Sequence, residues 1–228
     1  MKSTLFNMVA VLFGITLVAS AGVGVVNMIT VEPIAQAELT AKADALKQVL
    51  PPFDGTSDQT LTIDEIPVTV YTATRDGEVT GYAVESMSKN GFGGEVRLMV
   101  GFAPDGEVIN VNVLRQTETP GLGTKMADEG NVLLASIQGK NLEQMKLVDG
   151  KLAVRKDGGD VDALTAATIS SRAYVDAINR AYMAYRSVAR GVPATDVASG
   201  ASAQTGGDAR EGGENESVSY THLRAHET

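Results

Sequence analysis

The stretch of the chain best suited to chemistry runs from Asp162 to Ser171 and reads Asp-Ala-Leu-Thr-Ala-Ala-Thr-Ile-Ser-Ser. Apolar residues recur at helical spacing through 172–189, so these hydroxyl groups stand where a helix begins. We predict Ser170 or Ser171 as the N-cap of that helix. The first N–H groups of a helix lack partners and lie at the positive end of its dipole. The stretch is therefore a suitable binding site for a phosphate.

Two further loops could approach a ligand. Residues 118–123 read Glu-Thr-Pro-Gly-Leu-Gly, a compact loop whose backbone can come close to a bound group. Glu118 begins this loop and could act as an acid or a base. Residues 90–94 read Asn-Gly-Phe-Gly-Gly, but they lack the following helix and the Lys-Ser/Thr tail of nucleotide-binding loops. We therefore interpret this loop, taken alone, as a turn or a bulge.

Composition narrows the classes of function. The chain has 228 residues, of which 43% are hydrophobic, enough for one main domain with a sizeable core. Its 19 Lys and Arg against 28 Asp and Glu give a net charge of −9, which argues against a nucleic-acid partner. The absence of cysteine excludes disulfides, iron–sulfur clusters and thiolate zinc. Electron chemistry in this chain needs an organic cofactor, and we expect no metal site.

The N-terminal residues, 1–30, are predicted to be a membrane anchor. Lys2 is followed by a mostly apolar run from about Leu5 to Ile29, long enough to cross a bilayer as a helix. Residues 19–21, Ala-Ser-Ala, look like a signal-peptide cleavage site, but the apolar run continues past the length of a signal sequence. The positive-inside tendency places the N-terminus in the cytoplasm and the rest of the chain outside it.

The rest of the sequence predicts a single α+β domain. Residues 31–52 are expected to form a stalk helix that a Pro-Pro pair ends. Short alternating segments and turn signals early in 53–190 predict an antiparallel sheet with one solvated face and flanking helices. The Gly-, Ala-, Ser- and acid-rich residues 191–217 are expected to be disordered. Residues 218–228 hold both histidines and look like a translated sequencing adaptor, so we exclude them from fold reasoning.

Taken in order, these motifs resemble the G subunit of Rnf electron-transport complexes. The resemblance runs from the anchor to about Ala189 and is most specific at two places. These are the loop 118–123 and the pattern Asp162-x-x-Thr165-Ala166-Ala167-Thr168. The resemblance also includes residues 34–51, 90–94 and 98–101, and the last two of these segments favour the Rnf type. The C subunit of the sodium-pumping NADH:quinone reductase shares the two specific motifs and is the alternative family.

The resemblance implies a covalent cofactor, FMN, whose phosphate is esterified to Thr168 by a separate flavin transferase. The flavin ring would pack on Leu122 and hydrogen-bond near Thr119, whereas Asp162 would be read by the transferase. No residue of the chain is expected to be catalytic by itself. The cofactor-binding residues expected beside Thr168 are Thr165, Ala167, Ser170, Glu118, Thr119, Leu122, Gly123 and Asp162.

One residue departs from the family pattern. Members of the family usually have glycine where this chain has Ala166. If that position requires a positive φ, the alanine carries strain of about 1 kcal/mol.

The function implied by the resemblance is electron transfer within a membrane complex. That complex would couple electron flow between ferredoxin and NAD to sodium or proton movement. The chain would cross the inner membrane once, with the FMN-binding domain on the periplasmic side, in contact with the other Rnf subunits. Two alternatives come from other classes. One is a free-standing flavin reductase, which would need a second catalytic domain. The other is an anchored, cofactor-free interaction domain in which the threonine motif is only a helix cap.

Overall fold

The structure is a computed structural model, and residues 5–192 are described in it. The adaptor-like residues 218–228 lie outside this part of the chain, as do all but the first two of residues 191–217. The α+β class is confirmed by the described residues, which form an apolar N-terminal helix followed by one domain of antiparallel strands and helices.

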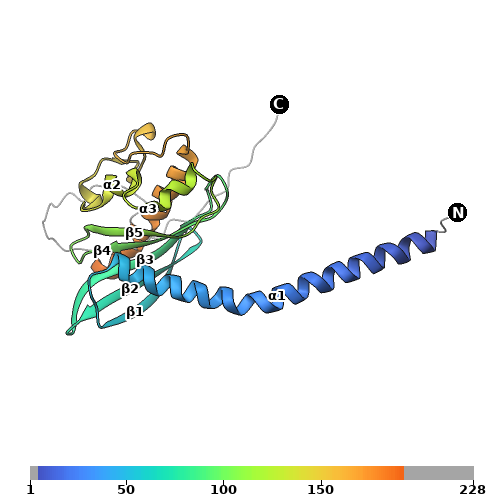
Figure 1. The fold of residues 1–228 in the computed structure, drawn as a ribbon. Helices are drawn as coiled ribbons and strands as arrows, with labels where there is room; N and C mark the ends of the chain where they lie inside the picture. The colour runs from blue at the N-terminus through green and yellow to red at the C-terminus, as the bar shows by residue number, and fades with distance from the viewer. Residues whose placement is uncertain (1–4, 193–228) are drawn as a thin grey trace, which may run out of the picture.

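The N-terminal helix, α1 (Leu5–Val49), runs without interruption through both the expected anchor and the expected stalk. Pro33 lies inside the helix and does not end it. The apolar part of α1 is long enough to cross a membrane, and its exposed side chains include nearly every large hydrophobic residue up to Ile34. Figure 1 shows that α1 extends away from the domain and touches it only at its C-terminal end.

Five antiparallel strands follow in a simple meander, each paired with its neighbour in the sequence. The turn between the second and third strands places Asp76 and Gly77 at positive φ, the conformation that an Asp-Gly pair favours in a hairpin. The predicted antiparallel sheet is confirmed. The strands are β1 (Gly55–Ile63), β2 (Ile66–Arg75), β3 (Glu78–Ser88), β4 (Val96–Phe102) and β5 (Val108–Arg115).

Shorter elements connect the sheet to a long C-terminal helix, α3 (Thr168–Arg190). They are the 3-10 helix η1 (Gly123–Ala127), the helix α2 (Val132–Ile137), η2 (Leu142–Gln144), the small hairpin β6 (Leu147–Val148) and β7 (Lys151–Leu152), and η3 (Arg155–Asp157). Gly191 ends α3 in the left-handed conformation that favours glycine.

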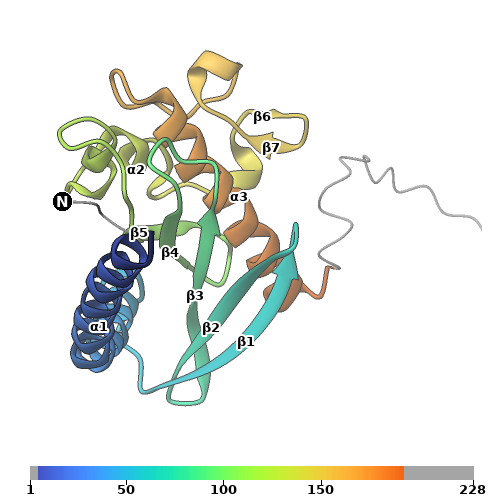
Figure 2. The same ribbon diagram turned by 90° about the vertical axis from the view of Figure 1, so that its right-hand side faces the viewer.

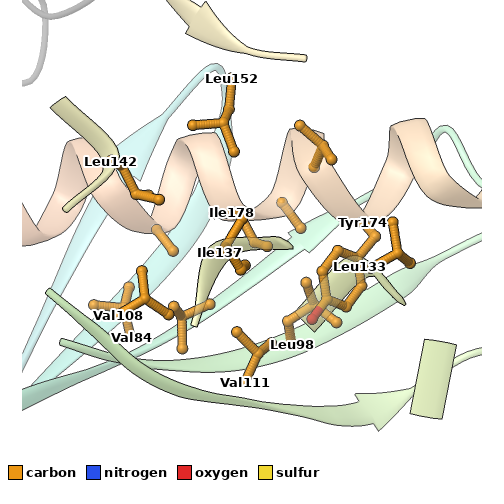
Figure 3. Close-up of a cluster of buried hydrophobic side chains, with 14 of the residues drawn as sticks. Val84, Leu98, Val108, Val111, Leu133, Ile137, Leu142, Leu152, Tyr174 and Ile178 are labelled. Atoms are coloured by element: carbon orange, nitrogen blue, oxygen red, sulfur yellow. The ribbon is translucent and has the colours of Figure 1, made fainter. Parts of the chain in front are cut away.

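The main core lies between α3 and one face of the sheet. The buried face of α3 is rich in alanine, which lets the helix pack closely on the strands, and Figure 2 shows it crossing them. Figure 3 shows Tyr174 and Ile178 of α3 among side chains such as Leu98 of β4, with Leu133 of α2 beside them. Burial of these apolar side chains fixes where α3 begins relative to the sheet.

The second face of the sheet is not solvated along its whole width. The C-terminal end of α1 covers part of it, where Val49 and Leu50 pack against Ala83 and Met99. As a result, six of the seven residues of β4 are buried. The expectation of one solvated face is therefore wrong for β4, because the C-terminal end of the expected stalk helix packs there as a core element.

Gly101 of β4 makes that packing possible. A Cβ atom at this position would overlap the backbone carbonyl of Val49. We predict that Gly101→Ala lowers the free energy of unfolding by about 1–3 kcal/mol, the usual range for overpacking. The same substitution at Gly55 of β1, whose added Cβ would lie 3.5 Å from Thr74 Oγ1, is the matched control. Chemical denaturation of the detergent-solubilised chain measures both. Equal effects of the two substitutions would contradict this role of Gly101.

Candidate functional site

The start of α3 is built differently from the sequence-based prediction. The N-cap is Ala167, not Ser170 or Ser171, and Thr168 is the first helical residue. The Ser171 hydroxyl donates to the carbonyl of Ala167 at 2.9 Å and accepts from the N–H of Leu164 at 2.9 Å. Through these two hydrogen bonds the Ser171 hydroxyl stabilises the turn that precedes α3. Because Ser171 is fully buried, its hydroxyl cannot contact a phosphate.

That turn contains Ala166 at φ +60°, in the left-handed region. The N–H of Ala167 donates to the carbonyl of Leu164 at 3.1 Å, which makes Ala166 the third residue of a four-residue turn. A positive φ at this position is the requirement of a type II turn, which prefers glycine there. The condition set out for Ala166 from the sequence is thus met, and the alanine is strained by roughly 1–2 kcal/mol.

A pocket of about 530 Å³ opens at the start of α3. Three segments that are distant in the sequence form it: the glycine-rich loop around Phe92, the loop 119–123 and the start of α3. Phe92, Leu122 and Ile169 remain substantially exposed, so apolar surface is open to a ligand. The lining residues are Phe92, Thr119, Leu122, Gly123, Ala166, Ala167, Thr168, Ile169 and Ser170.

Thr168 has a cationic neighbour. The Lys156 ammonium donates to the Thr168 hydroxyl oxygen, with 2.9 Å between Nζ and Oγ1. Lys156 lies in η3, and the residues on either side of it form ion pairs. Arg155 pairs with Asp162, and Asp157 pairs with Arg172 of α3.

The second of these ion pairs is bidentate. Arg172 donates to the two oxygens of Asp157 at 2.6 and 2.7 Å, and these hydrogen bonds hold the pKa of the Asp157 carboxyl below its usual value. Arg172 belongs to the first turns of α3, so the pair ties η3 directly to the helix that begins at Thr168. The ion pairs of its two neighbours, together with the backbone hydrogen bonds of η3, support the position of Lys156 beside Thr168.

Glu118 lies behind the pocket and is not part of its lining. Its side chain is 4% exposed, and its two carboxylate oxygens accept from the Ser170 hydroxyl and from the N–H of Gly93, the latter at 3.1 Å. Gly123 packs against the same pair of side chains, since a Cβ there would lie 2.6 Å from Ser170 Oγ and 2.7 Å from Glu118 Cβ. Glu118 thus links the glycine-rich loop to α3.

The structure brings together six of the residues singled out from the sequence. Thr119, Leu122, Gly123, Ala167, Thr168 and Ser170 all line the pocket. Three others do not. Glu118 is behind the wall, Thr165 is exposed in the turn, and Asp162 pairs with Arg155 while its N–H donates to Ser136 Oγ at 2.9 Å.

Sequence reasoning missed Phe92, Ile169 and Lys156. The sequence did contain a signal for Phe92, because the glycines on either side of it have no side chains against which the ring could pack. In the structure Phe92 is 69% exposed. Ile169 stands off the apolar stripe of α3 and is 47% exposed, which is also visible in the pattern. Lys156 carried no signal, since it stands twelve residues before Thr168 in a turn-like stretch.

The arrangement suits a flat apolar group that carries a phosphate. The pocket volume falls within the range of about 300–1,000 Å³ typical of small-molecule sites. The free N–H groups of the α3 start and the Lys156 ammonium are donors for an anion, and the exposed apolar side chains are surfaces for a ring. Within residues 5–192, no group of three or more His, Cys, Asp or Glu side chains could hold a metal ion.

Comparisons with known proteins agree with this geometry. The model of the FMN-binding domain family matches residues 91–183, which contain all three segments of the pocket. The G subunit of the ion-translocating oxidoreductase complex of Shewanella loihica is 33% identical over 193 residues, in an alignment that covers 79% of this chain and 89% of that protein. The protein of the same name from Vibrio cholerae is 36% identical over 173 residues, in an alignment that covers 72% of this chain and 82% of that protein.

The strain at Ala166 gives a direct test of the turn. We predict that Ala166→Gly raises the free energy of unfolding by about 1 kcal/mol, because glycine adopts a positive φ without a steric penalty. Ala135 is the matched control: it is exposed in the interior of α2, where replacement by glycine should lower stability by about 1 kcal/mol. Denaturant unfolding of both variants measures the difference. Destabilisation of both proteins would contradict the strained turn.

Proposed function

Because this chain belongs to the family of G subunits of ion-translocating oxidoreductase complexes, we propose that it carries electrons in such a complex through FMN attached covalently to Thr168. The observation that carries the proposal is the placement of Thr168 in the wall of a partly apolar pocket, at a helix start and within reach of Lys156. The alternative family, the C subunit of the sodium-pumping reductase, is less well supported, because the matching relatives are named as G subunits.

The phosphate end of the cofactor would lie at the start of α3. A phosphodiester on Thr168 keeps one negative charge, which the helix dipole and the unpartnered N–H groups of the first turn stabilise. The N-cap Ala167 has no side-chain oxygen to occupy those N–H groups. Lys156 adds a positive charge at the acceptor oxygen itself. The N–H groups that a capping side chain would otherwise occupy thus remain available to donate to the phosphate.

The ring end of the cofactor would lie between the two loops. Phe92 and Leu122 offer apolar surface from opposite loops, and the exposed Thr119 offers a hydroxyl and backbone groups for hydrogen bonding. When bound, FMN supplies the electron chemistry, and the protein binds, orients and partly shields it from water. Thr165 and Asp162 precede the acceptor in the chain and lie outside the pocket lining, which suits residues that a flavin transferase reads.

The membrane arrangement follows from α1. We propose that α1 crosses the inner membrane once with its N-terminus in the cytoplasm, so the FMN-binding domain faces the periplasm. The domain would occupy residues 53–190, after an anchor at 1–30 and a stalk at 31–52. Covalent attachment would keep the cofactor on the outer side of the membrane, where a free flavin would diffuse away. The other subunits of the complex would be its electron partners.

The acceptor residue is tested by denaturing gel electrophoresis after co-expression with a flavin transferase. We predict a fluorescent band for the wild-type chain and none for Thr168→Ala, since the covalent bond needs the hydroxyl. Thr62→Ala is the matched control, because Thr62 is an exposed threonine on β1, away from the pocket. Ser171→Ala is unsuitable as a control, because Ser171 braces the turn beside the acceptor. No band in the wild type would favour the cofactor-free interaction domain.

Lys156 provides a second test of the same proposal. We predict that Lys156→Met slows flavin attachment about tenfold, because a hydrogen bond to a charged group contributes about 1.5–3 kcal/mol. Lys156→Arg keeps the charge and should restore most of the rate. The time course of in-gel fluorescence with purified transferase measures the rates, with Lys151→Met on β7 as the exposed-lysine control. A Lys156→Met rate equal to that of Lys151→Met would contradict the role of Lys156.

A further inference from the structure

Glu118 is a buried carboxylate for which the binding of FMN gives no direct use. It is 4% exposed, and among the described residues 5–192 it takes part in none of the ion pairs. Placing an unpaired carboxylate in the protein interior costs several kcal/mol unless hydrogen bonds compensate it. The fold therefore maintains this group against a free-energy penalty.

The surroundings of Glu118 are shaped to fit it. Glycines approach the carboxylate from two loops: a Cβ at Gly91 would overlap Glu118 Oε1, and one at Gly123 would lie 2.9 Å from Oε2. Gly93 also closes on the backbone of Thr117, and its N–H donates to Oε1. Any side chain at Gly91 or Gly123 would displace the carboxylate.

The hydrogen bonds around Glu118 suit an ionised group. Each oxygen accepts one hydrogen bond, Oε1 from the Gly93 N–H and Oε2 from the Ser170 hydroxyl. An ionised carboxylate only accepts, so this pattern satisfies it without a proton of its own. The start of α3, to which Ser170 belongs, adds the favourable end of a helix dipole.

This charge lies one hydroxyl group away from the pocket. Ser170 lines the pocket on one side and donates to Glu118 on the other. Because the carboxylate is buried and no cation among the described residues pairs with it, its field is weakly screened in the direction of the pocket. A group in the pocket that gains negative charge is therefore destabilised by Glu118.

We infer that Glu118 is a positioning residue whose buried negative charge lowers the reduction potential of the flavin in this pocket. The inference rests on the proposed function, since it requires FMN at Thr168. Electrons added to the flavin increase its negative charge wherever protons do not fully follow them, so a nearby carboxylate disfavours the reduced form. Glu118 acts through the Ser170 wall and does not need to touch the ring.

The test is a reductive titration of the flavin-loaded, detergent-solubilised full chain at pH 8, with a reference dye to report the midpoint potential. Dithionite supplies two electrons to each flavin and water supplies the protons, so no further reactant is needed. Glu118→Gln removes the charge and keeps the shape, Glu118→Asp keeps the charge, and Asp58→Asn removes an exposed carboxylate on β1 as the matched control.

We expect a more positive midpoint potential for Glu118→Gln, with Glu118→Asp and Asp58→Asn remaining near the wild-type value. An unshifted Glu118→Gln, or an equal shift in Glu118→Asp, would overturn the inference and leave FMN at Thr168 intact. If Glu118→Gln takes up no flavin, Ser170→Ala decides: it leaves the Oε2 charge without its donor, so its potential should fall, and an unchanged or higher value would overturn the inference. A wild-type chain without bound flavin would instead overturn the proposed function.

Discussion

The hydrogen bonds of the Glu118 carboxylate are the interaction on which the candidate site depends. No strand pairing joins the glycine-rich loop, the loop 118–123 and the start of α3 within residues 5–192, yet these three segments form one pocket. Glu118 accepts from Gly93 in the first segment and from Ser170 in the third, while belonging to the second. The Glu118 carboxylate therefore leaves no room for side chains at the neighbouring glycines, Gly91 and Gly123. The loop 118–123 packs against the same carboxylate through Gly123.

Local patterns in the sequence were sufficient for much of the fold. Alternating apolar residues and Asp-Gly turns predicted the meander, the long apolar run predicted α1, and helical spacing predicted α3. The hydroxyl-rich stretch was also correctly placed at the start of α3, although the capping role of Ser170 and Ser171 was wrong. That error has a physical cause: each hydroxyl is drawn to a stronger partner, Ser170 to the distant Glu118 and Ser171 to the turn before the helix.

What the sequence could not provide are contacts between segments with no shared periodicity. Ser170 and Glu118 are 52 residues apart in the sequence. Val49 and the β4 residues that it covers are also far apart, and no local pattern connects them. Lys156 contacts Thr168 from η3, which backbone hydrogen bonds and two ion pairs hold against the start of α3. Ala166 is an intermediate case. From the sequence, this alanine was expected to be strained only if its φ is positive, and the structure gives a φ of +60°.

The uninterrupted course of α1 has a mechanical consequence. A helix rises about 1.5 Å per residue, so the part of α1 after the apolar run is about 30 Å long and ends packed against β4 and β5. No loop separates the bilayer-length segment of α1 from the sheet, so the part of α1 after Pro33, the one proline inside the helix, moves together with the domain. A change in tilt of about 20°, the average tilt of membrane helices, would move the C-terminal end of α1, and the domain packed on it, sideways by about 10 Å. The distance from the flavin to a neighbouring subunit would then be set by the angle of one helix, without any rearrangement inside the domain.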